Sequence, residues 1–274
     1  MRFASLGSGS RGNALLVEFD ATLLMVDCGL PCREIEERLG ALGRCGGDVA
    51  ALLVTHEHQD HLRGVAAFSR RYRTPIWATP GTARVLAAVD ELNVLCSHRP
   101  LRLGAVTVEP FPVPHDAREP CQFVFDAGGT RLGLLTDAGH VTPHASERLA
   151  GCDALALECN HDRPSLVRGD YPPSVKARVA SPYGHLDNAQ AAAFLETFVH
   201  PALQWVMAMH ISERNNSPDH VRAAISPVLD AADRPLHLAE QATPSGWIEI
   251  EQRKKGSEPF SARRRLRRTV TTLE

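Results

Sequence analysis

Apolar and polar residues follow one another along the chain in short runs that are typical of β-strands. Early in the chain these runs are separated only by tight turns, which predicts hairpins. Later runs are separated by stretches of helical periodicity. The predicted strands are residues 2–6, 13–19, 22–27, 49–55, 105–113, 121–127, 130–139, 152–158 and 202–210.

Three segments show apolar residues at helical spacing. Residues 31–42 have Pro31 in the first predicted turn, a favoured position for proline. Residues 62–72 and 186–199 are the other two, and the last has Asp187 or Asn188 as its N-cap. Strands in hairpins followed by strands alternating with helices predict a layered α/β fold.

The length of 274 residues allows one large domain or two small ones, and no linker is visible before residue 250. We therefore predict a catalytic domain over residues 1–250. Residues 251–274 form a basic tail with eight Lys/Arg and three Glu, although the whole chain has a net charge of −2. Such a tail is expected to be mobile; it is either merely solvated or attracted to an anionic partner.

Several classes of protein are disfavoured by composition. No stretch of about 18 apolar residues could cross a membrane, and residues 1–13 lack the apolar segment and cleavage site of an export signal. The seven cysteines are odd in number and none forms a C-x-x-C pair, which favours reduced thiols. We expect a cytoplasmic protein without a membrane partner.

Residues 7–12 (GSGSRG) fit the glycine pattern of a dinucleotide-binding turn. That mechanism requires a helix N-terminus after the glycines to receive the pyrophosphate. The following residues, NALLVEF, instead predict a strand. We therefore expect these glycines to make a tight turn or to let backbone pass close to a site.

The most informative stretch is residues 54–64 (VTHEHQDHLRG), which follows a predicted buried strand. It contains the pattern H-x-H-x-D-H. Extended backbone places His56 and His58 on one side, so both can reach one ion, while Asp60 and His61 can reach a second position. Imidazole and carboxylate ligands suit zinc first, then manganese or iron. One ion would need only three of these groups, which indicates two.

Further candidate ligands follow other predicted strands. His115 comes after FPVP, Asp137 lies in LGLLTDAG with a carboxylate that could bridge two ions, and His210 ends WVMAMH. Strand ends hold ligands rigidly. We therefore expect a metal site built from four separate segments.

These motifs together resemble the metallo-β-lactamase superfamily across residues 1–250. The segments GSGSRGNA, DCG, THEHQDH, ECNHD, GHLDNAQAA and HISERNNSP are similar to its bacterial WalJ/YycJ-like branch of 5′-to-3′ exonucleases. The resemblance implies a four-layer αββα sandwich with the site at one edge between two sheets. It implies a phosphodiester hydrolase that uses two metal ions and acts on nucleic acid, with DNA as the first candidate substrate and RNA as the second.

The resemblance also assigns ligands. It implies one ion on His56, His58 and His115, a second on Asp60, His61 and His210, and Asp137 as the bridge. The ions would be zinc or manganese, with iron as a third candidate. They would hold hydroxide ready for attack on phosphorus.

Further site residues follow by similarity to ribonuclease Z of the same superfamily, in which a Glu that ends a strand orients a His before a helix. Here Glu158 and His185 occupy those positions, so the expected catalytic residues are Asp60, His185 and Glu158. Ser212, Asn215 and Asn216 are candidate phosphate contacts. Asp27 is expected to support the ligand loop through hydrogen bonds. His140 and His161 are weaker candidates.

Two alternatives remain. A small thioester, lactone or cyclic phosphodiester could be hydrolysed on the same metals. A nucleic-acid-binding or regulatory protein with an idle site is the other, and it would be expected to lack a ligand, whereas every ligand position here is filled. Oligomeric state is not indicated by the sequence.

Overall fold

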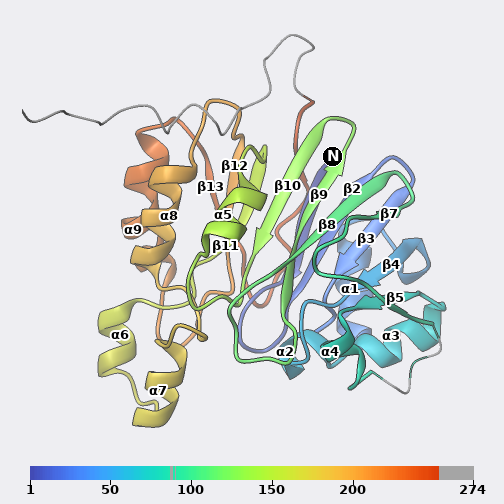
Figure 1. Cartoon of the computed structure of the whole chain (residues 1–274), viewed down its shortest axis with the longest axis horizontal. Helices are drawn as coiled ribbons and strands as arrows, with labels where there is room; N and C mark the ends of the chain where they lie inside the picture. The colour runs from blue at the N-terminus through green and yellow to red at the C-terminus, as the bar shows by residue number, and fades with distance from the viewer. Residues whose placement is uncertain (87–88, 90, 253–274) are drawn as a thin grey trace, which may run out of the picture.

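The computed structural model describes residues 1–86, 89 and 91–252, and the chain in these residues forms two seven-stranded sheets packed face to face. Helices cover both outer faces (Figure 1). This confirms the expected αββα sandwich. Most of the basic tail, residues 253–274, lies outside the described residues, so its predicted mobility stays a prediction.

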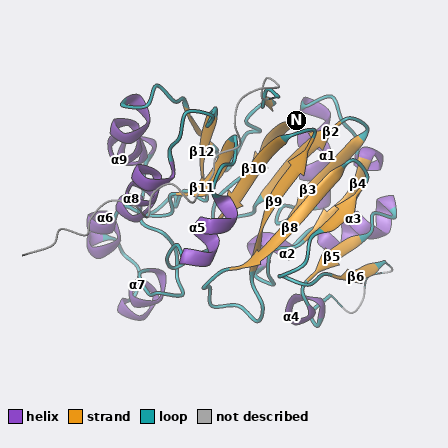
Figure 2. Ribbon diagram, turned by 45° about the horizontal axis from the view of Figure 1, so that its top comes forward, coloured by secondary structure: helices purple, strands orange, loops and turns teal. Residues whose placement is uncertain are grey.

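The first sheet is built from the N-terminal part of the chain and closed by a C-terminal strand (Figure 2). Its strands in spatial order are β14 (Ile248–Glu249), β1 (Arg2–Gly7), β2 (Ala14–Phe19), β3 (Thr22–Val26), β4 (Val49–Leu53), β5 (Ile76–Ala78) and β6 (Leu92–Val94). On its outer face lie α1 (Cys32–Ala41), α3 (Val65–Tyr72) and α4 (Pro80–Ala83), with a short 3-10 turn η1 (Gly46–Asp48) and α2 (Gln59–Leu62) in the connections.

The second sheet follows in sequence. Its strands in spatial order are β13 (Leu236–Leu238), β12 (Trp205–Met209), β11 (Ala154–Glu158), β10 (Thr130–Leu135), β9 (Cys121–Ala127), β8 (Val106–Pro112) and β7 (Leu101–Leu103). Its helices are α5 (Pro143–Leu149), α6 (Arg163–Arg168), α7 (Pro173–Val179), α8 (Asn188–Phe198) and α9 (Pro218–Asp230).

Three apolar clusters hold the layers together. The middle one lies between the sheets, where Phe3 and Val17 of the first sheet belong to the same buried cluster as Phe123 and Phe125 of the second. One outer cluster joins the second sheet to α5, α8 and α9. The other joins the first sheet to α1 and α3. Burial of these side chains is the main force that positions the strand ends.

Each sheet begins with antiparallel hairpins and continues with parallel strands. In the first sheet β3, β4, β5 and β6 are parallel neighbours, and in the second β10, β11, β12 and β13 are. The carboxyl ends of parallel strands meet at one edge of a sheet, where ligands of open α/β sheets bind. Most of the candidate site residues follow these strand ends, and His115 follows the antiparallel strand β8.

The glycine-rich turn of residues 7–12 leads into strand β2, so the structure confirms that it does not open a helix. A Cβ on Gly12 would lie 2.6 Å from the backbone oxygen of Gly29, and one on Gly29 would lie 1.6 Å from the backbone oxygen of Asp60. Backbone therefore passes close to the H-x-H-x-D-H loop, as expected. Asn13 N donates to Asp60 O at 2.8 Å across this contact.

Two helix predictions need correction. The helix predicted over residues 62–72 is interrupted, because α2 ends at Leu62 and α3 begins at Val65. Gly64 stands between them, where a Cβ would lie 2.2 Å from the backbone oxygen of Leu30. Pro31 is the N-cap of α1 rather than a residue of its first turn.

For α8 the sequence left two candidate caps, and Asp187 is the one used. Its side chain accepts from the Gln190 backbone N–H at 2.7 Å. The Gln190 side chain accepts in return from the Asp187 backbone N–H. This reciprocal pair fixes where the chain turns into the helix just after His185. Among the described residues, no helix is long and apolar enough to span a bilayer.

Gly29→Ala tests the close approach of backbone beneath the ligand loop. The added methyl group cannot fit against Asp60 O without moving backbone, so the free energy of unfolding should fall by about 3 kcal/mol. Denaturant unfolding measures this.

Gly40→Ala is the matched control. No atom lies within 4 Å of its added methyl group, and the position is helical. Alanine should therefore leave stability unchanged or raise it by up to about 1 kcal/mol. Equal unfolding midpoints for the two variants would show that the Gly29 contact is not tight.

Candidate metal centre and active site

The candidate site lies where strand ends of both sheets meet. Asp27 follows β3, His56 follows β4 after two residues, Asp137 follows β10 after one residue, and His210 follows β12 directly. The structure brings together all seven side chains expected as ligands, in overlapping groups whose ligand atoms lie within 4.8 Å of one another. These are His56, His58, Asp60, His61, His115, Asp137 and His210.

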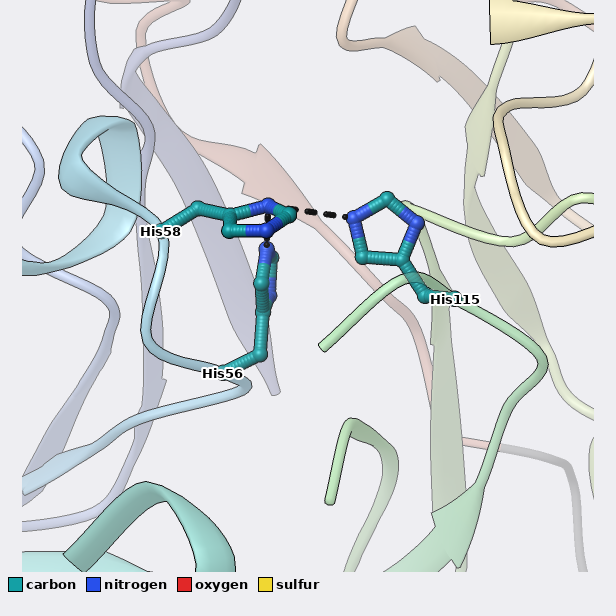
Figure 3. A group of neighbouring side chains, drawn as sticks. All are labelled: His56, His58 and His115. Atoms are coloured by element: carbon teal, nitrogen blue, oxygen red, sulfur yellow. Dashed lines mark hydrogen bonds between the residues drawn. The ribbon is translucent and has the colours of Figure 1, made fainter. Parts of the chain in front are cut away.

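His56, His58 and His115 form the first group, with their rings directed toward one another (Figure 3). His56 Nε2 lies 3.0 Å from His58 Nδ1, and His115 Nε2 lies 3.3 Å from the same atom. The three nitrogens thus converge from the loop after β4 and the loop after β8.

In His56 and His115 the hydrogen bond made by Nδ1 determines whether the converging Nε2 carries a proton or a lone pair. Thr55 Oγ1 donates to Asp27 Oδ2, so toward His56 Nδ1, at 3.0 Å, it can only accept. His115 Nδ1 lies 3.0 Å from the carbonyl oxygen of Gly184, which also accepts. Both rings therefore hold their proton on Nδ1 and present a lone pair at Nε2. Both lone pairs face His58 Nδ1, and three imidazole nitrogens directed at one point form a set that fits a divalent metal ion.

Asp60, His61 and His210 form the second group. Asp60 Oδ2 lies 3.5 Å from His61 Nε2 and 3.4 Å from His210 Nε2. His61 Nδ1 donates to Asp27 Oδ2 at 2.7 Å, which leaves Nε2 free to act as a ligand. A carboxylate behind the ring is the usual support of a metal-binding histidine.

Asp137 lies between the two groups. Its Oδ2 is 3.5 Å from His61 Nε2, while its Oδ1 is 3.6 Å from His210 Nε2 and 4.0 Å from His115 Nε2. Oδ2 is buried and has no hydrogen-bond partner in the described structure. An orphaned buried carboxylate oxygen is costly unless a cation satisfies it. This position matches that of a ligand shared by two ions.

The two halves of the site differ in charge. Burial lowers the pKa of His56 well below its ordinary value and also lowers the pKa of His115, so both rings stay neutral. Burial would likewise lower the pKa of His210, but Asp137, Asp60 and Glu158 outweigh it and raise that pKa to about 10. The second half therefore holds protons where it could hold a metal ion instead.

Asp27 supports the ligand loop, as the sequence predicted. Its Oδ1 accepts from the Thr55 backbone N–H at 2.8 Å, and its Oδ2 accepts from the Thr55 hydroxyl and from His61. Since Thr55 in turn accepts from His56, one buried carboxylate orients a ligand of each group. Sequence reasoning identified Asp27 but missed Thr55.

Glu158 contacts two histidines where the sequence indicated one. Its Oε1 accepts from His185 Nδ1 at 2.7 Å, the expected pair, and also from His210 Nδ1 at 3.1 Å. Its Oε2 accepts from the backbone N–H groups of Ala138 and Leu186. Burial would raise the pKa of Glu158, but His185 and His210 lower it to about 2. The carboxylate is therefore ionised and holds both rings.

The backbone is strained at three of these positions. Asp27, Asp137 and His210 adopt positive φ values of 59°, 53° and 53°. This left-handed conformation costs about 1–2 kcal/mol for a residue with a side chain. Each position lies immediately after a strand or one residue beyond it, where the turn directs the side chain into the shared site.

A hollow of about 310 Å³ opens onto this cluster. Of the three residues expected to contact phosphate, Ser212 and Asn215 line this hollow and Asn216 does not. The Asn216 amide donates to Cys159 O and exchanges hydrogen bonds with the Asn188 side chain. These bonds hold the loop after His210 against the end of β11 and the start of α8, and a phosphate contact by Asn216 stays a prediction.

The weaker candidates lie apart from the cluster. His140 is exposed, with Nδ1 3.0 Å from the carbonyl oxygen of Pro182. His161 is buried and pairs with Asp187 through backbone. Sequence reasoning missed Asn13 and Asn160, although both lie in quoted motifs: Asn13 Nδ2 lies 3.3 Å from His61 Nε2, and Asn160 Nδ2 donates to His210 O.

Comparison with known proteins identifies a matching family and several relatives of this chain. Residues 22–211 match the beta-lactamase superfamily domain. The chain is 33% identical to the exodeoxyribonuclease YycJ of Bacillus anthracis over 84% of this chain and 89% of that protein. It is 30% identical to the exodeoxyribonuclease WalJ of Streptococcus pneumoniae, over 85% and 89% respectively.

Among solved structures, the metallo-beta-lactamase fold protein YhfI from Bacillus subtilis superposes with a TM-score of 0.72. It covers 90% of this chain and 99% of its own, at 14% identity. A structural similarity at that level of sequence identity shows the fold and carries no information on the reaction.

Asp27→Asn should weaken metal binding without removing a ligand. The amide nitrogen cannot accept from both Thr55 and His61, so the ligands of both groups lose their orientation. We expect a fall in affinity for zinc of about 10- to 100-fold, measured by competition with a chromogenic chelator. Asp126→Asn, a partly exposed strand residue of β9, is the control, and an equal affinity in both variants would contradict the role of Asp27.

Proposed function

The chain belongs to the beta-lactamase superfamily, and on that premise we propose that it is a dinuclear-metal phosphodiester hydrolase acting as a 5′-to-3′ exonuclease on DNA. Two relatives that align along most of their length are named exodeoxyribonucleases. The site supports metal-dependent hydrolysis because its converging imidazole nitrogens and its buried carboxylate oxygen without a hydrogen-bond partner both suit divalent cations.

The proposed ligands of the ions are the seven side chains brought together by the strand ends. His56, His58 and His115 would hold one ion and Asp60, His61 and His210 the other, with Asp137 shared. Zinc or manganese suits this set of nitrogen and carboxylate ligands. When bound, such ions supply a hydroxide nucleophile and stabilise charge on the phosphate oxygens.

The pair of His185 and Glu158 is the observation that carries phosphodiester chemistry. His185 Nδ1–H donates to Glu158 Oε1, so Nε2 remains for the substrate. Its ring lines the hollow and is 16% exposed, whereas the ring of His210 beside it is 3% exposed. In its imidazolium form, with a second proton on Nε2, a histidine held there can donate that proton to the leaving oxygen and return to the neutral ring.

Ser212 and Asn215 are the proposed phosphate contacts. Both line the hollow on the loop that follows His210. Ser212 Oγ accepts from the Asn215 backbone N–H at 3.1 Å, which leaves its hydroxyl proton available to a phosphate oxygen. The loop thus presents neutral donors beside the ligands.

Protein reconstituted with excess zinc or manganese and then desalted should retain two ions per chain, because seven ligand side chains exceed what one ion uses. Among substitutions of the candidate ligands, Asp137→Ala should lower the metal content of both positions most, since the two oxygens of Asp137 face both groups. Elemental analysis decides this, and a maximum of one ion in the unsubstituted protein would refute the dinuclear proposal.

His185→Ala should keep both ions and the unfolding midpoint of the unsubstituted protein, yet lose about 10²- to 10⁴-fold in kcat. Activity is measured on 5′-labelled DNA and RNA, with a glutathione thioester as the competing substrate class. Turnover of the thioester without cleavage of DNA or RNA would overturn the nuclease proposal. A fully active His185→Ala enzyme would remove His185 from the mechanism.

Glu158→Gln provides the comparison variant. Because Glu158 also accepts from His210, a candidate ligand, this change should lower metal affinity as well as kcat. His185→Ala should lower kcat alone. The split between metal content and rate separates the two roles of the carboxylate.

A further inference from the structure

The segment between Asp162 and Gly184, here called the α6–α7 segment, lies below α8 and α9 in the view of Figure 1 and contributes residues to the lining of the hollow at the site. It is tied to loops on both sides of the cluster. Asp162 N donates to Asn215 O at 2.9 Å in the loop after His210, and Asp116 N donates to Tyr183 O at 3.0 Å in the loop after β8. The segment is therefore a fixed wall of the site.

Three residues of this wall line the hollow beside the candidate ligands: Tyr171, Arg178 and Val179. Tyr171 lies in the turn between α6 and α7. The guanidinium carbon of Arg214 is 5.7 Å from the centre of its ring, which helps to hold the ring in place. The segment's other tyrosine, Tyr183, is 60% exposed and lies outside the hollow.

Arg178 is oriented by an acid at the rim. Its Nε donates to Asp116 Oδ2 at 2.5 Å, and Asp116 Oδ1 lies 3.5 Å from His115 Nε2. The side chain of Arg178 is 60% exposed, and its two terminal nitrogens have no partner among the described residues. A guanidinium held on its Nε side keeps those donors free for the oxygens of a phosphate.

We propose that the hydrolysed strand enters unpaired, with the base of the reacting nucleotide stacked on Tyr171 and an adjacent phosphate bound by Arg178. This inference rests on the proposed nuclease function and concerns how the reacting end of the strand is held at the site. In a duplex both faces of a base are covered by its neighbours, so a paired base cannot lie on Tyr171. An aromatic ring beside a free guanidinium is the combination that binds single strands without reading their sequence.

Substitutions of Tyr171 test the stacking contact. Affinity is measured by anisotropy in EDTA, which prevents hydrolysis, with a 3′-labelled single-stranded DNA of ten nucleotides. Tyr171→Leu should weaken binding by about tenfold, and Tyr171→Phe should restore it, because stacking needs the ring and not the hydroxyl. Tyr183→Leu, the matched control, should bind like the unsubstituted protein.

A second comparison separates stacking from a structural role of the ring. An oligonucleotide with an abasic site at its terminal nucleotide should lose about as much affinity for the unsubstituted protein as Tyr171→Leu loses for intact DNA. Combined, the two changes should cost little more than either alone, since they remove the same contact. Fully additive losses would overturn the stacking proposal.

Arg178→Gln tests the phosphate contact. The slope of log affinity against log salt should become shallower by about one, with a smaller change for Arg178→Lys, which keeps the charge. Arg168→Gln, an exposed arginine of the same segment outside the hollow, is the control. An unchanged slope in Arg178→Gln would overturn this contact.

The preference for an unpaired end is tested with metal-loaded protein on matched DNA ends. A single-stranded overhang should be degraded at least about tenfold faster than a blunt duplex, because the paired end must first unstack. Equal rates with unchanged binding by Tyr171→Leu would overturn this inference and leave the nuclease function intact. Absence of cleavage on every DNA and RNA end would instead overturn the nuclease function.

Discussion

Desolvation of carboxylates is the constraint on which the site depends. Asp27, Asp137 and Glu158 are almost fully buried and Asp60 is largely so, all at one edge of the sandwich. Ionised groups in such a place need compensating positive charge. Histidine rings at the strand ends provide it in the absence of metal, and divalent ions would provide more of it. The tight turns, close backbone contacts and support by Thr55 all serve to bring these charges together.

The fold was predictable where local pattern and long-range packing agree. Apolar strands in hairpins and then alternating with helices are visible in the sequence, and both sheets follow that order. The 13-residue helix α9 was not predicted, because its Pro218 start and internal Pro227 disguise the periodicity. The break before α3 depends on a contact between Gly64 and Leu30, which are far apart in sequence. Such contacts have no local signal.

The clustering of the seven candidate ligands was predictable because metal chemistry needs particular residue types at strand ends. The supporting residues were harder to identify. Asn13 and Tyr171 carry no diagnostic spacing, and they reach the site only because distant loops fold against it. Asn216 shows the limit of local reasoning: it was chosen for its proximity in sequence to His210, and the sequence gives no sign that its amide is engaged with Asn188. Direction of a side chain is a tertiary property.

Glu158 couples two properties of the site that would otherwise change independently, the orientation of the proton donor and the orientation of a candidate metal ligand. One oxygen of this carboxylate contacts both His185 and His210, so a substitution that retunes the proton donor also disturbs a ring expected to hold metal. Few substitutions at the centre are therefore neutral, because each one must preserve the contacts of Glu158 with both histidines. The α6–α7 segment carries no such double obligation, as its contacts to the ligand loops run largely through backbone. Sequence changes that alter substrate choice should therefore accumulate in the α6–α7 segment, while the ligand cluster stays the same.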